Sequence, residues 1–285
     1  MLLIVGYILI LGSAIGTYAI HGSLAALWMP TEYIAIAGLF VGGLVASNSG
    51  AVLKKILGAL PGLFKGSPYT RAYYMNVLGL LFEILSKVRK EGLMSIENDV
   101  ENPASSPLFA RYPEILADHH VLAFITDYLR MMVGGNLNTL EIENLMEQEL
   151  EAHHHEAALP GHQMNKAGDA LPAFGIVVAV MGVVNVMGSV GEPPPVLGKM
   201  IGGALVGTFL GILLSYGFVQ PIASQLELKA NEGSHIYHVV KAVLLASMSG
   251  YAPQVAIEFG RKNLPSDARP TFLELEEDLK NRKNH

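Results

Sequence analysis

The sequence contains no cysteine, which excludes disulfide bonds and thiolate metal sites. It is also poor in charge, because charged residues make up 15% of the 285 residues and hydrophobic residues 51%. Asp, Glu, Lys, Arg and His are all missing from four long segments, residues 2–20, 33–53, 170–190 and 200–221. A helix rises about 1.5 Å per residue, so each segment can cross the roughly 30 Å hydrocarbon core of a bilayer. The sequence therefore predicts an all-α, polytopic membrane protein with four transmembrane helices.

Lys and Arg are also missing from one side of the predicted membrane. Residues 21–32 contain neither and residues 191–199 contain only Lys199, so 18 of the 19 basic residues lie elsewhere. Because basic residues near span ends are retained on the cytoplasmic side, we expect both termini and the long middle segment to be cytoplasmic. The predicted organisation is transmembrane helices 1 and 2 in 1–53, a cytoplasmic helical domain in 54–169, transmembrane helices 3 and 4 in 170–221, and a cytoplasmic helical tail in 222–285.

A cleaved signal peptide is the alternative for the first apolar segment. No Lys or Arg leader precedes it, and it is longer than the usual signal-peptide core of about 7 to 15 residues. We therefore expect a retained span.

The charged middle segment has helical periodicity, with no alternating strand pattern of useful length. Helices are predicted at about 70–90, 113–133 and 139–153. The last begins where Asn138 is followed by Glu141, a pairing typical of helix starts.

The C-terminal tail is predicted to continue as helices after Pro221. The pattern breaks at Gly250 and restarts near Pro253. A final helix is expected to begin at Thr271, three residues before Glu274. We expect the tail to pack on the middle segment.

Glycines recur at four-residue spacing in three of the predicted spans. Small residues at this spacing let helix backbones approach closely in lipid, although glycine is also simply commoner in membrane helices. We expect a packing role, most strongly in the fourth span. The glycines are Gly12 and Gly16, Gly38 and Gly42, and Gly203, Gly207 and Gly211.

Ionisable side chains are absent inside all four predicted spans. Proton relays and ion sites in membranes normally use such a group within a span. If this protein conducts a cation, the titrating group must therefore come from a partner, which disfavours a stand-alone pump or channel.

The sequence offers little for an enzyme, a cofactor or a nucleic acid. The only metal-like cluster is His153, His154 and His155 with His162 nearby, and consecutive helical residues point in different directions. We interpret the cluster as a polar helix end and predict no metal site. No nucleophile elbow, paired carboxylates or cofactor motif is present, and the net charge of −6 argues weakly against nucleic acid.

Two charged residues and two prolines remain as candidate site residues. Arg89 and Glu97 flank Gly92, where they would either close one helix and open the next or form a docking surface. Pro172 would occupy the first turn of the third span, and Pro221 would end the fourth. The notable polar groups inside the spans are Thr208 and Tyr216.

Several stretches resemble the MotA family of flagellar motor stator subunits. Ala204-Leu-Val-Gly-Thr-Phe-Leu-Gly-Ile-Leu, followed seven residues later by Pro221, is similar to the family signature. The stretches from Asp169 to Ile176, from Arg89 to Glu97 and from Gly250 to Lys262 resemble other characteristic parts of the family. The likeness covers nearly the whole chain.

This resemblance implies that the chain surrounds the single transmembrane helix of MotB, which carries the ion-binding aspartate. It implies a homopentameric ring around a MotB dimer in the bacterial inner membrane, turning the rotor through the protein FliG, with no covalent catalysis and no cofactor. Arg89 and Glu97 would then face FliG, and Pro172 and Pro221 would lie near the aspartate and couple its protonation to a conformational change.

Ala179 bears on the choice of ion. Sodium-driven relatives place a threonine hydroxyl at the aligned position of span three, and a dehydrated sodium ion needs such oxygen ligands. Alanine offers none, which favours protons, although Thr208 in span four leaves a sodium-driven stator open.

Two further classes stay open as alternatives. An ExbB or TolQ-like energiser of outer-membrane processes usually has three spans, and the four spans and the Arg89 to Glu97 run argue against it. A membrane scaffold or receptor without ion flux is the other alternative.

Overall fold

The structure, a computed structural model, describes residues 2–135 and 138–283. Within these residues it is helical, with no strand. The chain forms two compact units, the first comprising Met1–Gly66 and Ala157–Lys229, and the second comprising Ser67–Glu156 and Ala230–His285. Two long helices, α9 (Thr139–Met187) and α11 (Gln220–Met248), contribute to both units.

The first unit holds the apolar helices. Its elements are α1 (Leu2–His21), α2 (Leu24–Leu27), α3 (Pro30–Ala46), α4 (Gly50–Ala59), the 3-10 turn η1 (Leu60–Phe64) and α10 (Pro194–Leu214), with the parts of α9 and α11 named above. Four stretches of the described chain are long and apolar enough to cross a membrane: Leu2–His21, Leu24–Ala46, and parts of Thr139–Met187 and Pro194–Met248. The predicted all-α class with four candidate spans is confirmed.

The second span differs from its predicted bounds of 33–53. α3 ends at Ala46, and Ser49 starts a new helix by accepting a hydrogen bond from the Val52 amide. A serine at this position favours a helix start over a helix interior. The apolar run therefore divides into two helices although its composition is continuous.

The third span is not a separate helix. The predicted helix at 139–153 and the predicted span at 170–190 both belong to α9, which runs on through Pro160 and Pro172. Pro172 is thus in a helix interior, and the prediction that it occupies a first turn is wrong. Prolines are tolerated inside membrane helices where neighbouring groups bond the backbone atoms that they free.

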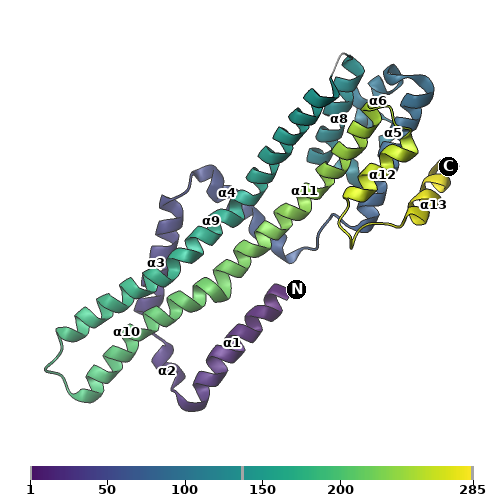
Figure 1. Cartoon of the computed structure of the whole chain (residues 1–285). Helices are drawn as coiled ribbons and strands as arrows, with labels where there is room; N and C mark the ends of the chain where they lie inside the picture. Colours follow the sequence, from purple (N-terminus) through teal and green to yellow (C-terminus); the bar gives the residue numbers. More distant parts are fainter. Residues whose placement is uncertain (1, 136–137, 284–285) are drawn as a thin grey trace. The chain divides into compact units, whose positions relative to one another are not determined.

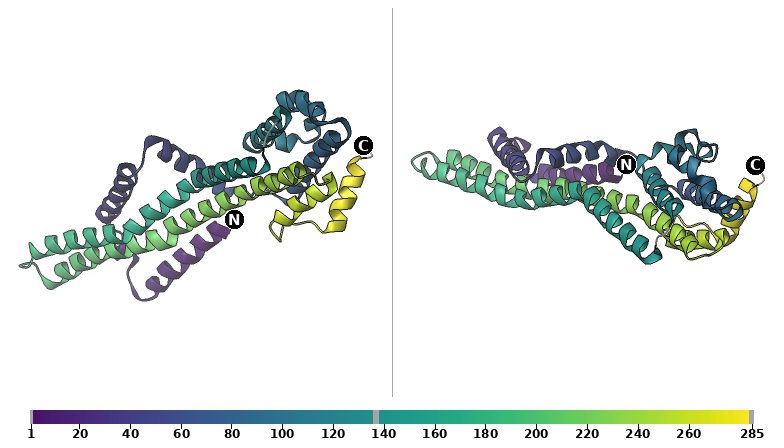
Figure 2. Two further views of the ribbon diagram at one scale, coloured as in Figure 1. Left: turned by 45° about the horizontal axis from the view of Figure 1, so that its top comes forward. Right: turned by 90° about the horizontal axis from the view of Figure 1, so that it is seen from above.

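The helix continues past Pro221, as predicted for the tail, and the end of the fourth span at Pro221 stays a prediction. α10 passes through a π-helical turn at Ser215–Val219 into α11, where Pro221 is the second residue. Pro221 has no N–H to donate to the helix, and it directly follows the turn in which the Gln220 amide bonds the Ser215 carbonyl. In the first unit α9 lies antiparallel beside α10 in every view (Figures 1 and 2).

The compact units divide the chain at other residues than the predicted domains. The first unit includes residues 54–66, 157–169 and 222–229 in addition to the predicted spans. The reason is continuity of packing, because Leu63, Met164 and Leu226 share one apolar cluster there. The predicted division followed the membrane surface and stays a prediction.

The second unit is a helical domain with a continuous apolar core. Its elements are α5 (Arg71–Glu91), α6 (Glu97–Glu101), α7 (Pro113–Ala117), α8 (His119–Gly134), α12 (Pro253–Asn263) and α13 (Phe272–Lys283), with short 3-10 turns at Leu93–Ile96, Pro103–Ser105 and Phe109–Arg111. The core joins α5 and α8 to α11, α12 and α13, which confirms that the tail packs on the middle segment.

Most predicted helix boundaries in this unit are confirmed. α5 matches the helix predicted at 70–90, and Asn138 caps the start of α9 by accepting from the Leu140 amide at 3.1 Å. The helix predicted at 113–133 is divided, however. Asp118 accepts a hydrogen bond from the Val121 amide at 3.2 Å and so begins α8 anew after α7.

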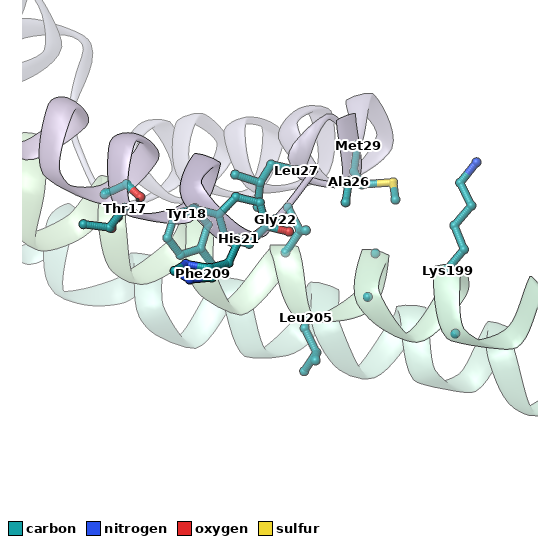
Figure 3. Close-up of a pocket in the computed structure, with 15 residues that line it drawn as sticks. Thr17, Tyr18, His21, Gly22, Ala26, Leu27, Met29, Lys199, Leu205 and Phe209 are labelled. Atoms are coloured by element: carbon teal, nitrogen blue, oxygen red, sulfur yellow. Dashed lines mark hydrogen bonds between the residues drawn. The ribbon is translucent and has the colours of Figure 1, made fainter. Parts of the chain in front are cut away.

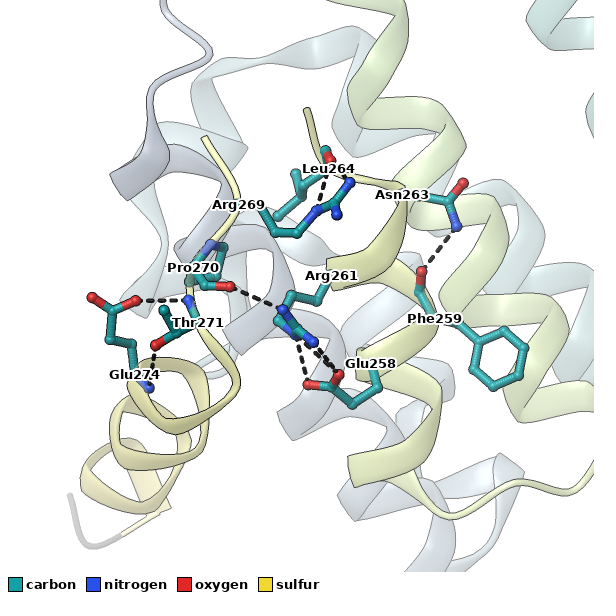
Figure 4. Close-up of polar contacts among 9 residues, drawn as sticks. All are labelled: Glu258, Phe259, Arg261, Asn263, Leu264, Arg269, Pro270, Thr271 and Glu274. Atoms are coloured by element: carbon teal, nitrogen blue, oxygen red, sulfur yellow. Dashed lines mark hydrogen bonds and ion pairs between the residues drawn. The ribbon is translucent and has the colours of Figure 1, made fainter. Parts of the chain in front are cut away.

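Arg261 of α12 bonds the segment that leads into α13, and its side chain is buried in the second unit (Figure 4). Its guanidinium donates to both carboxylate oxygens of Glu258 and, at 3.1 Å, to the carbonyl of Pro270. Thr271 and Glu274 bond each other's backbone amides, which begins α13 where the sequence predicted it.

Candidate functional site

The contact between α9 and α10 is an approach of backbones. A Cβ atom added at Gly175 would lie 2.8 Å from the carbonyl oxygen of Gly207, and one at Gly211 would lie 2.7 Å from that of Leu171. Distances this short leave no room for any side chain. The packing role predicted for the fourth-span glycines is therefore confirmed at Gly207 and Gly211.

The other glycines of the pattern behave differently. Gly203 faces the side chain of Met29, with 3.1 Å between an added Cβ atom and the methionine Cε. Added Cβ atoms on the four glycines of spans one and two would meet nothing within 4 Å, and their packing role stays a prediction; these are Gly12, Gly16, Gly38 and Gly42.

Pro172 lies one turn from this glycine contact. Because proline has no N–H, the carbonyl of Gly168 loses the hydrogen bond that residue 172 would normally donate. The Ser215 hydroxyl donates to that carbonyl instead, at 2.7 Å, from a side chain that is 0% exposed. Sequence reasoning missed Ser215, because serine in a span normally bonds its own helix.

Gln220, the residue before Pro221, bonds both Ser215 and the part of α9 next to Gly168. The Gln220 backbone amide donates to the Ser215 carbonyl, which closes the π-helical turn. The Gln220 side-chain amide donates to Asp169 Oδ1 at 2.6 Å. Asp169 lies inside α9, and its side chain bonds Gln220 across the helix contact.

Ala179 and Thr208 lie on the two sides of the same helix contact. An added Cβ atom at Gly207 would lie 3.3 Å from the Ala179 amide nitrogen, and one at Gly175 would lie 3.3 Å from Thr208 Cα. Tyr216 does not join them, because its side chain is 61% exposed. Residues 170–190 and 200–221 contain no Asp, Glu, Lys, Arg or His, so both helices lack these groups at this level.

Arg89 and Glu97 are exposed on either side of one sharp turn in the second unit. α5 ends at Gly92, whose φ of 86° is readily adopted only by glycine, and Glu97 opens α6. Among the described residues neither charge forms an ion pair or a side-chain hydrogen bond. The helix-end explanation accounts for their positions, and both charges also remain available to a partner.

An ion pair between the partly exposed Lys87 and the buried Asp99 stabilises this turn. Lys87 donates to Asp99 Oδ2 at 2.7 Å, and the Ser106 hydroxyl donates to Asp99 Oδ1 at 2.6 Å. Burial alone would raise the pKa of the Asp99 carboxyl, but the two hydrogen bonds and the Lys87 charge outweigh it and lower that pKa. Lys87 and Asp99 stand twelve residues apart, so their contact is not visible in the sequence.

A cleft of about 440 Å³ adjoins Arg89 in the second unit. Its lining includes Phe82, Leu108 and Pro253 together with several charged side chains. The charged lining consists of Glu83, Lys87, Arg89, Lys90, Glu91, Arg111 and Arg282. Basic groups outnumber acidic ones there, so the cleft suits an acidic segment with an apolar side chain.

A second hollow lies in the first unit, between α1 and α10 (Figure 3). It encloses about 890 Å³, and its lining is mainly apolar, including Tyr18, Leu205 and Phe209, together with His21 and Lys199. None of the predicted site residues lines it.

The histidines at 153–155 lie inside α9 and not at a helix end, because α9 continues past them. His153 shares a hydrogen bond of 3.2 Å with the Tyr237 hydroxyl, and His154 shares one of 2.9 Å with the Ser234 hydroxyl. Burial lowers the pKa of His153. The described residues contain no group of three side chains able to hold a metal ion.

Comparison with known proteins covers the chain from end to end. Residues 4–92 match the family "Motility protein A N-terminal" and residues 117–238 match the "MotA/TolQ/ExbB proton channel family". Motility protein A of Escherichia coli strain K12 is 50% identical over 285 residues, 100% of this chain and 97% of the relative. Motility protein A of Salmonella typhimurium strain LT2 is 47% identical over 281 residues, 98% of this chain and 95% of the relative.

A solved structure has the same fold. The flagellar MotAB stator complex from Bacillus subtilis contains a chain that matches with a TM-score of 0.74 at 24% identity, covering 93% of this chain and 96% of that one. A chain of the MotAB structure from C. jejuni matches with the same TM-score of 0.74 at 19% identity.

Proposed function

The chain belongs to the motility protein A family, within the MotA/TolQ/ExbB proton channels, and from this membership we propose that it is a stator subunit of a bacterial flagellar motor. With a MotB partner it forms a proton-conducting channel that couples ion flow to torque on the rotor. The 50% identity to a motility protein A over the whole chain disfavours the alternative of an ExbB or TolQ-like energiser.

One observation carries the channel part of the proposal. α9 and α10 meet along a backbone contact at Gly175, Gly207 and Gly211, and their apolar segments 170–190 and 200–221 contain no Asp, Glu, Lys, Arg or His. Such a wall can line a pathway but cannot bind and release a proton by itself. The ion-binding group, an aspartate, is supplied by MotB.

The two prolines are the residues on this wall that we assign to conformational coupling. Pro172 interrupts the hydrogen bonds of α9, and Pro221 follows the π-helical turn that leads into α11. π-helical turns inside longer helices occur frequently at functional sites. Protonation of the MotB aspartate would act on these two irregular turns.

The conducted ion is a proton in this proposal. Ala179 lies at the α9–α10 contact and has no side-chain oxygen, whereas a dehydrated sodium ion requires oxygen ligands. The half-buried Thr208 is the one hydroxyl-bearing residue of α10. Exchanging external sodium for potassium at constant proton gradient should leave swimming speed unchanged, and a speed that follows sodium would overturn the assignment.

We assign the rotor contact to the exposed turn between α5 and α6. Arg89 and Glu97 present opposite charges there without internal partners among the described residues, and the charged lining of the adjoining cleft is mainly basic. The partner is the rotor protein FliG. The second unit and both termini are then cytoplasmic, and the chain forms a pentameric ring around two MotB chains in the inner membrane.

Co-expression with the MotB partner tests the channel. Vesicles containing both chains should acidify under a proton gradient, whereas vesicles with either chain alone should not. Absence of flux with the partner present would leave the membrane scaffold as the better reading.

Charge reversal tests the rotor contact. Arg89→Glu should reduce swimming while the amount of protein in the membrane stays normal, and a compensating charge change on the rotor should partly restore it. Lys262→Glu changes an exposed charge of the same unit and serves as the control. Failure of every compensating change would assign Arg89 to closing helix α5 only.

A further inference from the structure

Pro172 leaves one backbone carbonyl of α9 without its helical hydrogen bond. A proline in a helix interior removes the hydrogen bond to the carbonyl four residues earlier, here that of Gly168. Gly168 is buried, and an added Cβ atom there would lie 3.1 Å from Val219 Cγ1 of the π-helical turn, so the two segments pack closely at this residue. Water cannot serve a carbonyl that is covered in this way, and an unpaired buried carbonyl is costly.

The Ser215 hydroxyl replaces the hydrogen bond that the Gly168 carbonyl loses, and it does so from a different helix. Ser13 of α1 and Ser234 of α11 bond a carbonyl of their own helix, that of Leu9 at 2.7 Å and that of Ala230 at 3.0 Å. Ser215 is 0% exposed and donates across to α9 instead. Its hydroxyl therefore serves the contact between helices.

The same residue also supports the turn that precedes Pro221. The carbonyl of Ser215 accepts the Gln220 amide and closes the π-helical turn, while the Gln220 side chain donates to Asp169 beside Gly168. Ser215 thus touches both irregular turns, through its hydroxyl toward Pro172 and through its carbonyl toward Pro221. A second link, from Gln220 to Asp169, runs parallel to it.

We propose that Ser215 is a positioning residue that ties the Pro172 turn of α9 to the Pro221 turn of α11, so that the two prolines move as one hinge. Its hydrogen bond to the Gly168 carbonyl is the contact through which movement of one turn reaches the other. The inference rests on the proposed stator function for its role in coupling, whereas the link between the residues is testable without ion flow.

A double-mutant cycle tests the link in the purified complex with MotB. Ser215→Ala removes the donor and should lower the thermal midpoint by about 2 to 4 °C. Pro172→Ala restores a backbone N–H to the Gly168 carbonyl, so in that background Ser215→Ala should change the midpoint by less than half as much. Equal changes in both backgrounds would overturn the proposal.

Hydrogen exchange tests whether the two turns move together. In Ser215→Ala, amide exchange should rise both at residues 170–176 and at residues 216–223. Ser13→Ala removes a serine hydroxyl that bonds only its own helix, and it should leave both segments unchanged. Faster exchange confined to one of the two segments would show that Ser215 does not join them.

Proton flux tests the functional part. Ser215→Ala should lower flux per complex about three- to tenfold, the range that one neutral hydrogen bond supplies, and Ser215→Thr should retain more flux because it keeps the hydroxyl. Full flux in Ser215→Ala would refute the positioning role. No flux in the unaltered complex would instead refute the proposed function, and the thermal cycle would still decide whether Ser215 and Pro172 are coupled.

Discussion

Replacing Gly211 by alanine should force α9 and α10 apart. An added Cβ atom would lie 2.7 Å from the Leu171 carbonyl oxygen and 2.8 Å from Gly175 Cα. Both are backbone atoms, so no side-chain rotation relieves the overlap. Because ordinary contact begins near 3.4 Å, the two helices have to separate locally by about 0.7 Å.

The cost of this separation can be compared with a control on the same helix. Overpacking a well-packed contact costs about 1–3 kcal/mol. Alanine in place of glycine also gains about 0.5–1 kcal/mol in a helix, because glycine loses more conformational freedom on folding. At Gly202 an added Cβ atom would meet nothing within 4 Å, so Gly202→Ala carries the gain without the cost.

The assay is thermal unfolding of the purified complex with MotB in detergent, with the amount of protein in the membrane measured beside it. Gly211→Ala should have a free energy of unfolding about 1–3 kcal/mol below that of Gly202→Ala. Swimming should fall in Gly211→Ala and persist in Gly202→Ala. Equal stabilities of the two variants would refute the close backbone approach at Gly211.

Two further changes probe the second unit. Asp99→Asn removes the charge that Lys87 and Ser106 stabilise and should cost about 1.5–3 kcal/mol at neutral pH. Folding lowers the pKa of Asp99, so the stabilisation by its carboxylate is present above the ordinary aspartate pKa of 3.8 and is lost as the pH falls below that value. Thermal midpoints of the variant and of the unaltered chain should therefore converge between pH 7 and pH 3. Parallel curves over this range would contradict the role of the charge. Thr271→Ala removes the hydroxyl oxygen that accepts from the Glu274 amide and caps α13, and it should lower the free energy of unfolding by about 1 kcal/mol. Hydrogen exchange should become faster in α13 alone. Faster exchange in α12 as well would contradict a local cap.

Part of the candidate site could be read from residue types and spacing. Arg89 and Glu97 stand beside Gly92, and the structure places both on an exposed turn. Gly207 and Gly211 repeat at a spacing that favours backbone contact, which α9 makes. These features are visible because each depends on neighbours within one or two helical turns.

Other parts could not be read in this way. Residue type predicts Pro172 in the first turn of the third span and Pro221 at the end of the fourth, because proline normally interrupts a helix interior. Both lie within longer helical runs, since the lost hydrogen bond of one is replaced by Ser215 and the other follows a π-helical turn. The pair of Lys87 and Asp99 was hidden for a similar reason, because its two members meet only after α5 and α6 have packed.

The sequence by itself determined the class of this protein. Composition alone shows the uncharged runs of transmembrane length, the bias of Lys and Arg to one side, and the lack of Asp, Glu, Lys, Arg and His in the spans. These features are legible without the fold because the transfer of a charge into hydrocarbon is costly in any fold. Tertiary structure alone decided where the helices continue and what holds their irregular turns. The carbonyl that Pro172 leaves unpaired is satisfied by Ser215, 47 residues away, and only packing of α10 on α9 brings that hydroxyl within 2.7 Å.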